Sequence, residues 1–120
     1  MTKGQIEAQV SEAIIRFEKE YMGRGPIATK TYIIEDMILV RLKGVLTPAE
    51  GQLSKSPEGA DLIKKTRVRL LEEGRVLLEN IIADITGCQV KSLHTDISTR
   101  IGELMIIFML DQDLGKKLCE

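Results

Sequence analysis

Apolar residues recur at every third or fourth position near the start of the chain, at Ile6, Val10, Ala13, Ile14, Phe17 and Tyr21. This spacing is typical of one face of an α-helix, and it predicts an amphipathic helix over residues 5–22. The cluster Gly23-Arg24-Gly25-Pro26 is expected to end that helix. Residues 27–34 and 37–43 are rich in β-branched and apolar types, with Glu35-Asp36 between them. These two runs predict a β-hairpin with a tight turn.

The middle of the chain is predicted to form a short helical turn, a loop and one long helix. Leu46-Thr47-Pro48-Ala49-Glu50 fits a helix start, because its threonine can cap the turn while proline and glutamate occupy the first and third positions. Residues 51–57 are rich in Gly, Ser, Lys and Pro, which is typical of a surface loop. A helix is expected from about residue 58 to about residue 86, closed by Gly87.

A second hairpin is predicted over residues 88–98 and 103–111, around the turn Thr99-Arg100-Ile101-Gly102. The order of elements is therefore α-β-β-α-β-β, which indicates the α+β class. We expect a four-stranded, mainly antiparallel sheet with two helices on one face.

One strand of this sheet carries more apolar residues than a single core requires. Leu104–Leu110 is apolar at both parities, so both of its faces are expected to be buried. Two helices cover only one face; the other also receives Ile33 together with Met37 and Leu39 or their neighbours, depending on register. We expect a second copy of the chain to cover that face, which predicts a homodimer. The alternative is that the loop over residues 44–57 folds over it.

Length and charge narrow the class of protein. A chain of 120 residues fits one domain, residues 1–120, with a core over about 5–111 and a C-terminal tail over 112–120. The 17 basic and 18 acidic residues give a formal net charge of −1. A general nucleic-acid or anionic-membrane binder normally carries a basic excess, so no nucleic-acid partner is expected.

The cellular compartment is inferred from what the sequence lacks. Its longest apolar run, Leu104–Leu110, is far shorter than the roughly 20 residues that cross a bilayer, and no signal-peptide core follows Met1. Cys88 and Cys119 are not in a metal-binding spacing, and with a single histidine no metal site is expected. We expect a reduced, cytoplasmic protein, with a Cys88–Cys119 disulfide as the less favoured alternative.

The predicted long helix places a charged group on its apolar side. Arg67 falls inside the apolar stripe, while Lys64 and Arg75 lie along its edge. A buried guanidinium needs a partner, because an unpaired buried charge is very costly. One interpretation is an anion pocket built from Arg67, Arg75 and Arg24. The other leaves Arg67 in solvent, or pairs it with Glu50 or with an acidic residue of a second subunit.

Two further positions are candidate contact sites. Gly23 and Gly25 free the backbone for positive φ and present Arg24 at a loop tip, where it could hold a phosphate or carboxylate. The favoured interpretation of this loop is a helix C-cap followed by Pro26 at the start of a strand. The loop matches no nucleotide-binding motif.

His94 and Asp96 lie two apart on a predicted strand, so their side chains share a face with Ser92 and Ser98. A histidine near a carboxylate can act as a general base, but no nucleophile completes such a site. A polar strand face in solvent is the favoured interpretation. No catalytic residue, metal or cofactor is assigned.

Two motifs in this order point to a family. The chain, over about residues 6–111, resembles the small bacterial MpsC family in Gly23-Arg24-Gly25-Pro26, in Gly44-Val45 followed by Leu46-Thr47-Pro48-Ala49-Glu50, and in the long helix with Arg67 and Arg75. That family is labelled a component of a Na+-translocating, membrane-potential-generating system.

The resemblance implies a non-enzymatic accessory or regulatory protein that assists a membrane cation or inorganic-carbon transport system. Its expected partners are integral-membrane transport subunits, and its expected place is the cytoplasm, peripheral at the inner face of the membrane. The alternative is a cytosolic domain that binds a small anion or small molecule through Arg24, Arg67 and Arg75. The family carries over no catalytic residue to this sequence.

Overall fold

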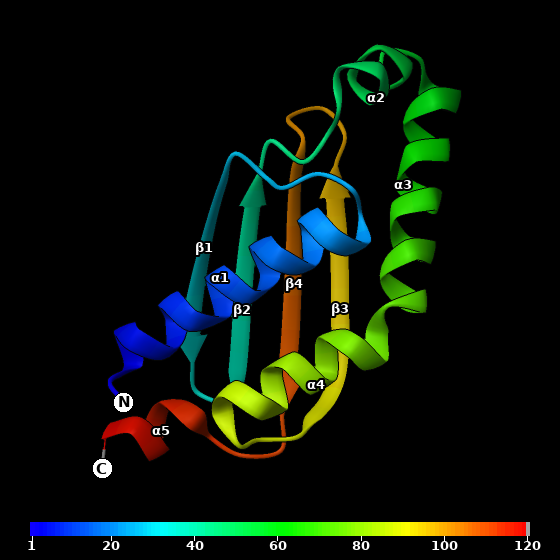
Figure 1. Ribbon diagram of the computed structural model, residues 1–120. Coiled ribbons are helices and arrows are strands. Elements are labelled where there is room, and N and C mark those ends of the chain that lie inside the picture. The colour runs from blue at the N-terminus through cyan, green and yellow to red at the C-terminus, as the bar shows by residue number, and fades with distance from the viewer. Residues whose placement is uncertain (120) are drawn as a thin grey trace.

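Capping boxes start the two helices that flank the first hairpin. Helix α1 (Lys3–Tyr21) begins where the Thr2 hydroxyl accepts the Gln5 N–H and the Gln5 side chain accepts the Thr2 N–H. Strands β1 (Ala28–Ile34) and β2 (Met37–Lys43) follow, and then helix α2 (Pro48–Leu53). The computed structural model describes residues 1–119, and its arrangement is drawn in Figure 1. The remaining elements are α3 (Pro57–Glu73), α4 (Arg75–Thr86), β3 (Val90–Ser98), β4 (Glu103–Leu110) and α5 (Leu114–Cys119).

The four strands form one antiparallel sheet in the order β1-β2-β4-β3. The pairing of β3 with β4 shifts register between Val90 and Ser92, so Lys91 forms an irregularity near the start of β3. Helices α1 and α4 pack against each other over one face of the sheet (Figure 1). The predicted α+β class and the order α-β-β-α-β-β are confirmed.

The prediction of one long helix over residues 58–86 is wrong in one respect. The segment forms two helices, α3 and α4, which meet at Gly74. The Gly74 backbone has φ −90° and ψ 7°, outside the α-helical region. A Cβ at this position would lie 3.1 Å from both Phe17 Cζ and Tyr21 Cε1. The bend lets α4 cross the sheet beside α1, while α3 stands along the β3 side (Figure 1).

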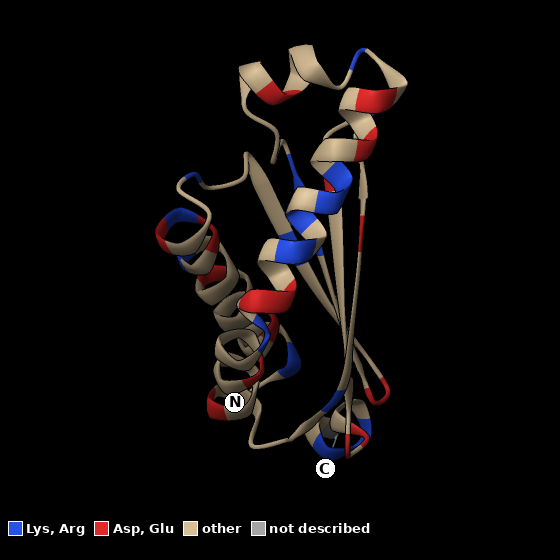
Figure 2. Ribbon diagram, turned by 90° about the vertical axis from the view of Figure 1, so that its right-hand side faces the viewer, with Lys and Arg blue, Asp and Glu red and all other residues tan. Residues whose placement is uncertain are grey.

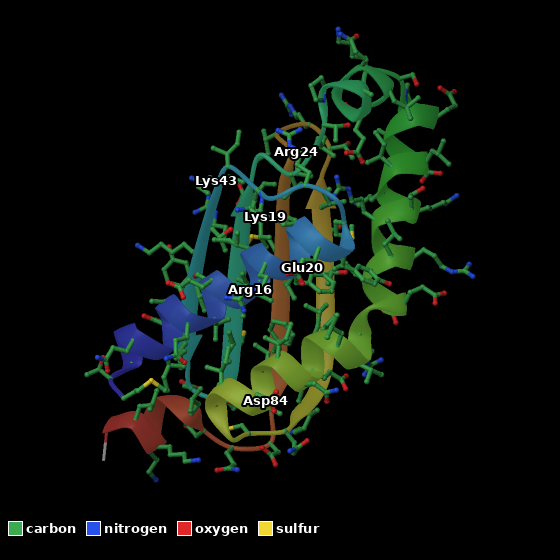
Figure 3. The ribbon with its side chains drawn as sticks, in the orientation of Figure 1. Arg16, Lys19, Glu20, Arg24, Lys43 and Asp84 are labelled. Atoms are coloured by element: carbon green, nitrogen blue, oxygen red, sulfur yellow. The ribbon has the colours of Figure 1, made fainter. Side chains whose placement is uncertain are left out.

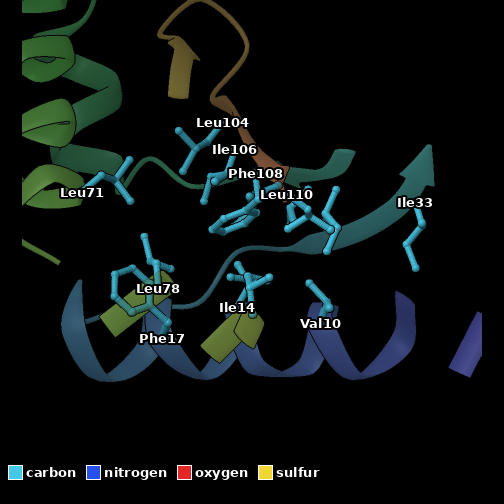
Figure 4. Packing of buried hydrophobic residues seen from close by; sticks show 14 of the residues in the cluster. Val10, Ile14, Phe17, Ile33, Leu71, Leu78, Leu104, Ile106, Phe108 and Leu110 are labelled. Atoms are coloured by element: carbon cyan, nitrogen blue, oxygen red, sulfur yellow. The ribbon is translucent and has the colours of Figure 1, made fainter. Parts of the chain in front are cut away.

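The core lies between the sheet and helices α1 and α4. Figure 4 shows Ile14 and Phe17 of α1 and Leu78 of α4 facing Ile106 and Phe108 of β4. The tail expected after residue 111 contains α5, whose Leu114 is buried in the same cluster.

The opposite face of the sheet is open, and we call it the outer face. In Figure 2 the sheet is seen from its edge, with α1 and α4 on one side and no described helix over the middle of the other. Helix α2 packs against α3 at one end of the sheet, so the 44–57 segment does not cover the outer face (Figure 1). Strand register and burial place seven apolar side chains on the outer face, namely Tyr32, Ile34, Met37, Leu39, Met105, Ile107 and Met109.

Met37 and Leu39 therefore lie on the predicted face, but the placement of Ile33 there is wrong. Ile33 pairs with Ile38 and is 1% exposed, because β1 turns this position toward the helices. Of the two cysteines, Cys88 is buried. The side chain of Cys119 lies outside the described residues, and so does the predicted alternative of a Cys88–Cys119 pair.

Candidate functional site

A buried arginine on α3 joins three segments that are far apart in the sequence. Arg67 is 7% exposed. Its Nε and Nη2 donate to the Glu50 carboxylate over 3.2 and 2.7 Å, and Nη2 also donates to the Val45 carbonyl oxygen over 2.8 Å. The guanidinium is thus hydrogen-bonded to a carboxylate, as a buried charge requires. Of the two interpretations of Arg67, the structure shows the pairing with Glu50.

Glu50 is held in place from two sides. Its carboxylate accepts the Thr47 N–H over 3.0 Å, and its own N–H donates to the Thr47 hydroxyl over 3.1 Å, which completes the capping box of α2. Burial alone raises the pKa of Glu50, but hydrogen bonds from Arg67 and Thr47 outweigh it and hold that pKa below its usual value. The Leu46-Thr47-Pro48-Ala49-Glu50 motif is therefore both a helix start and the anchor for Arg67.

Glu18 of α1 is the third charged group of this network. It is 1% exposed, and its Oε2 lies 4.0 Å from Arg67 Nη1, whereas Oε1 has no hydrogen-bond partner among the described residues. Burial raises its pKa to about 7, although the positive charge of Arg67 acts in the opposite direction. Sequence reasoning missed Glu18. A signal existed, because Glu18 follows the apolar Ile14 by four residues and so shares its helix face.

The first family motif, Gly23-Arg24-Gly25-Pro26, contacts the second, Leu46-Thr47-Pro48-Ala49-Glu50, through a single arginine. Gly23 lies after the end of α1 and has a φ of +87°. Residues with a side chain rarely adopt this backbone conformation. Arg24 Nη1 then donates to the Leu46 carbonyl oxygen over 3.0 Å. Figure 3 shows Arg24 at the same end of the sheet as Lys43. The loop therefore ends α1, and its Arg24 also connects it to the second motif by this hydrogen bond.

The other predicted contact residues do not join this network. Arg75 Nε donates to Glu79 on the same helix over 2.8 Å, so Arg24, Arg67 and Arg75 do not form one anion pocket. Lys64 Nζ lies 3.2 Å from Asp96 Oδ1, an exposed ion pair between α3 and β3. His94 Nε2 lies 3.1 Å from the Ser92 hydroxyl oxygen.

Neither a metal site nor a membrane span is found in the described part of the chain. Residues 1–119 hold no group of three His, Cys, Asp or Glu side chains positioned to bind a metal ion. Over the same range, no helix has the length and apolar character needed to cross a bilayer.

The fold and the network define a small α+β protein in which a buried arginine ties a capping-box loop to two helices. The chain belongs to the MpsC family, described as "Na+-translocating membrane potential-generating system (MpsC)", whose model matches residues 2–112. The predicted family is therefore confirmed.

Two relatives span nearly the whole chain. It is 50% identical over 117 residues to "Uncharacterized protein YbcI" of Bacillus subtilis (strain 168), covering 98% of this chain and 94% of the relative. It is 22% identical over 111 residues to "Uncharacterized protein YrhF" of the same organism, covering 91% and 90%. The search of solved structures gave no match.

Proposed function

We propose that this protein is a non-enzymatic accessory or regulatory protein of a membrane cation or inorganic-carbon transport system. It acts through protein–protein contacts, as a homodimer, in the cytoplasm at the inner face of the membrane. Membership of the MpsC family, with its description as a Na+-translocating membrane potential-generating system, supports the link to transport. The open apolar outer face is the observation that carries the proposal of protein–protein contacts.

The outer face has the composition of a surface that another protein covers. Its seven apolar side chains come from three adjacent strands, and Leu39 and Ile107 are directly paired near its centre. Monomeric proteins seldom leave so large an apolar patch on one face of a sheet. A second copy of the same chain is the occupant that we propose.

Charge at the two ends of the strands supports a second copy. The charged residues toward one end include Lys30, Arg41, Lys43 and Glu103, and those toward the other include Glu35, Asp36, Lys91 and Asp111. The first end is therefore net basic and the second net acidic. A two-fold axis across the strands would lay the basic end of one copy over the acidic end of its partner. The face is then complementary to itself, as a two-fold interface requires.

The role in transport is tested by cell fractionation. Membranes from cells that make the protein at its native level are pelleted at low and at high salt, after cross-linking, and the partners are identified by mass spectrometry. We expect the protein in the pellet at low salt, cross-linked to an integral-membrane subunit of a cation transporter. Recovery only in the soluble fraction at both salts would contradict the accessory role.

A further inference from the structure

A pocket outside the Arg67 network brings together three loops at one end of the sheet. Its volume is about 370 Å³, and it is open to solvent. The first motif contributes Arg24, the second contributes Leu46 and Thr47, and the β3–β4 turn contributes Thr99 and Arg100. These segments are far apart in the sequence, so only the folded chain forms this pocket.

The two arginines of the pocket differ from most others in the protein. In the described part of the chain, four arginines form ion pairs with glutamates, namely Arg41, Arg67, Arg69 and Arg75. Within residues 1–119, neither Arg24 nor Arg100 has a carboxylate within ion-pair distance. Two uncompensated guanidinium groups therefore border one cavity, in a chain whose net charge is −1.

The pocket wall offers hydrogen-bond donors and no competing negative charge. None of the described residues that line it is acidic. Arg24 uses Nη1 to bind the Leu46 carbonyl oxygen, which orients its guanidinium, and its other nitrogens make no hydrogen bond within residues 1–119. The Thr47 hydroxyl accepts the Glu50 N–H, so its own proton remains available for donation. The Thr99 hydroxyl is a further donor.

The buried network fixes one wall of this pocket before any ligand binds. Arg67 holds both the Val45 carbonyl and the Glu50 carboxylate, on either side of Leu46 and Thr47. A wall that is already ordered loses little conformational entropy on binding, which favours affinity.

We infer that this pocket binds a small multivalent oxyanion, held by Arg24 and Arg100 with hydroxyl donors from Thr47 and Thr99. Phosphate and carboxylate groups share this chemistry, because each presents several oxygens to guanidinium donors. The inference adds a ligand site to the proposed function and does not depend on the homodimer or on the membrane partner.

Calorimetric titration of the full chain with pyrophosphate and with citrate tests the site, with sodium chloride at matched ionic strength as the blank. We expect saturable binding of at least one probe, and the two arms distinguish a phosphate ligand from a carboxylate ligand. Arg100→Gln is expected to weaken binding about tenfold, the effect of losing one charge-assisted hydrogen bond. Arg24→Gln should do the same.

Arg16→Gln is the matched control. Arg16 is an exposed arginine of α1 that does not line the pocket, and its substitution makes the same change in net charge. It is expected to leave binding unchanged. The absence of saturable binding to the wild-type chain would overturn the inference. So would equal losses in the Arg16 and Arg100 variants, or full affinity in both pocket variants. Because Arg100 makes no side-chain hydrogen bond within residues 1–119, its variant remains informative if Arg24→Gln disturbs the loop.

Discussion

Arg67 lies between two carboxylates, those of Glu50 and Glu18, and its contacts with them differ. It makes two hydrogen bonds to Glu50, whereas Glu18 lies at 4.0 Å and keeps one oxygen without a partner among the described residues. Because Glu18 is almost fully buried, its ionised form is unfavourable, and the nearby negative charge of the more exposed Glu50 adds to that effect. This explains why burial shifts the pKa of Glu18 upward while hydrogen bonding shifts the pKa of Glu50 downward.

A pH-dependent loss of stability follows from Glu18. Its pKa is about 7 in the folded protein and 4.5 in the unfolded reference, so between these pH values the folded state binds more protons. The free energy of unfolding therefore falls as pH rises from 4.5 through 7, by up to about 3 kcal/mol in total. Glu18→Gln cannot ionise and should be more stable than the wild type at pH 8 by up to this amount. Urea unfolding between pH 5 and 8 measures the difference.

Glu20→Gln provides the control for that experiment. Glu20 is an exposed residue of the same helix, and its substitution removes the same formal charge. We expect this variant to keep the pH dependence of the wild type. If Glu18→Gln also keeps it, the assignment to Glu18 is wrong.

At the scale of the elements, Gly74 decides how the second half of the chain meets the first. The bend directs α4 across the sheet, and Gly74 itself packs against the stacked rings of Phe17 and Tyr21, whose centroids are 4.9 Å apart. Helix α3 keeps a separate direction, in which Arg67 reaches Glu50 and Val45, while Leu71 near its C-terminal end joins the core cluster. One small residue thus separates α4, which crosses the sheet, from α3, which carries Arg67.

A larger side chain at this bend should destabilise the protein. Gly74→Leu must displace Phe17 or Tyr21, since even its Cβ would lie 3.1 Å from both rings. Overpacking of this kind costs about 1–3 kcal/mol of unfolding free energy. Gly4→Leu is the control, because a Cβ at Gly4 meets nothing within 4 Å. Chemical denaturation of both variants tests this, and equal stabilities would contradict a packing role for Gly74.

At the scale of the whole molecule, the sheet has one covered face and one open face. The helices cover Ile38, Val40 and Leu42 of β2, which are fully buried, whereas the alternate positions of the same strand are half-buried or exposed. The molecule measures 49 × 23 × 22 Å along its principal axes. The apolar part of the outer face lies on β1, β2 and β4, and such a sheet face is suited to packing against a similar face.

The proposed homodimer predicts how substitutions on this face change the molecular mass in solution. Light scattering at micromolar concentration should give a dimer for the wild type. Ile107→Lys should give a folded monomer, since it places a charge at the centre of the interface while the lysine can reach solvent in the free chain. Val76→Lys makes the same change at a 69% exposed position of α4 and should remain dimeric. A monomeric wild type would rule out the homodimer.

Local pattern was enough to predict the elements and the class of the fold. Hydrophobic spacing identified α1 and both hairpins, and the second motif identified the start of α2, because these features depend on residues within a few positions of each other. The two motifs were also enough to identify the family. Strand β4 indicated an excess of apolar surface, because apolar residues occupy both its odd and its even positions.

Tertiary structure alone decided which of these residues meet. The break at Gly74 depends on Phe17 and Tyr21, 57 and 53 positions earlier in the chain, so helical periodicity could not reveal it. The register of β1 against β2 turned Ile33 inward, since a shift of one residue exchanges the two faces of a strand. Arg24 and Arg100 border one pocket only because the first motif and the second hairpin turn lie at the same end of the sheet. Contacts between distant segments arise from packing, and local sequence pattern does not encode them.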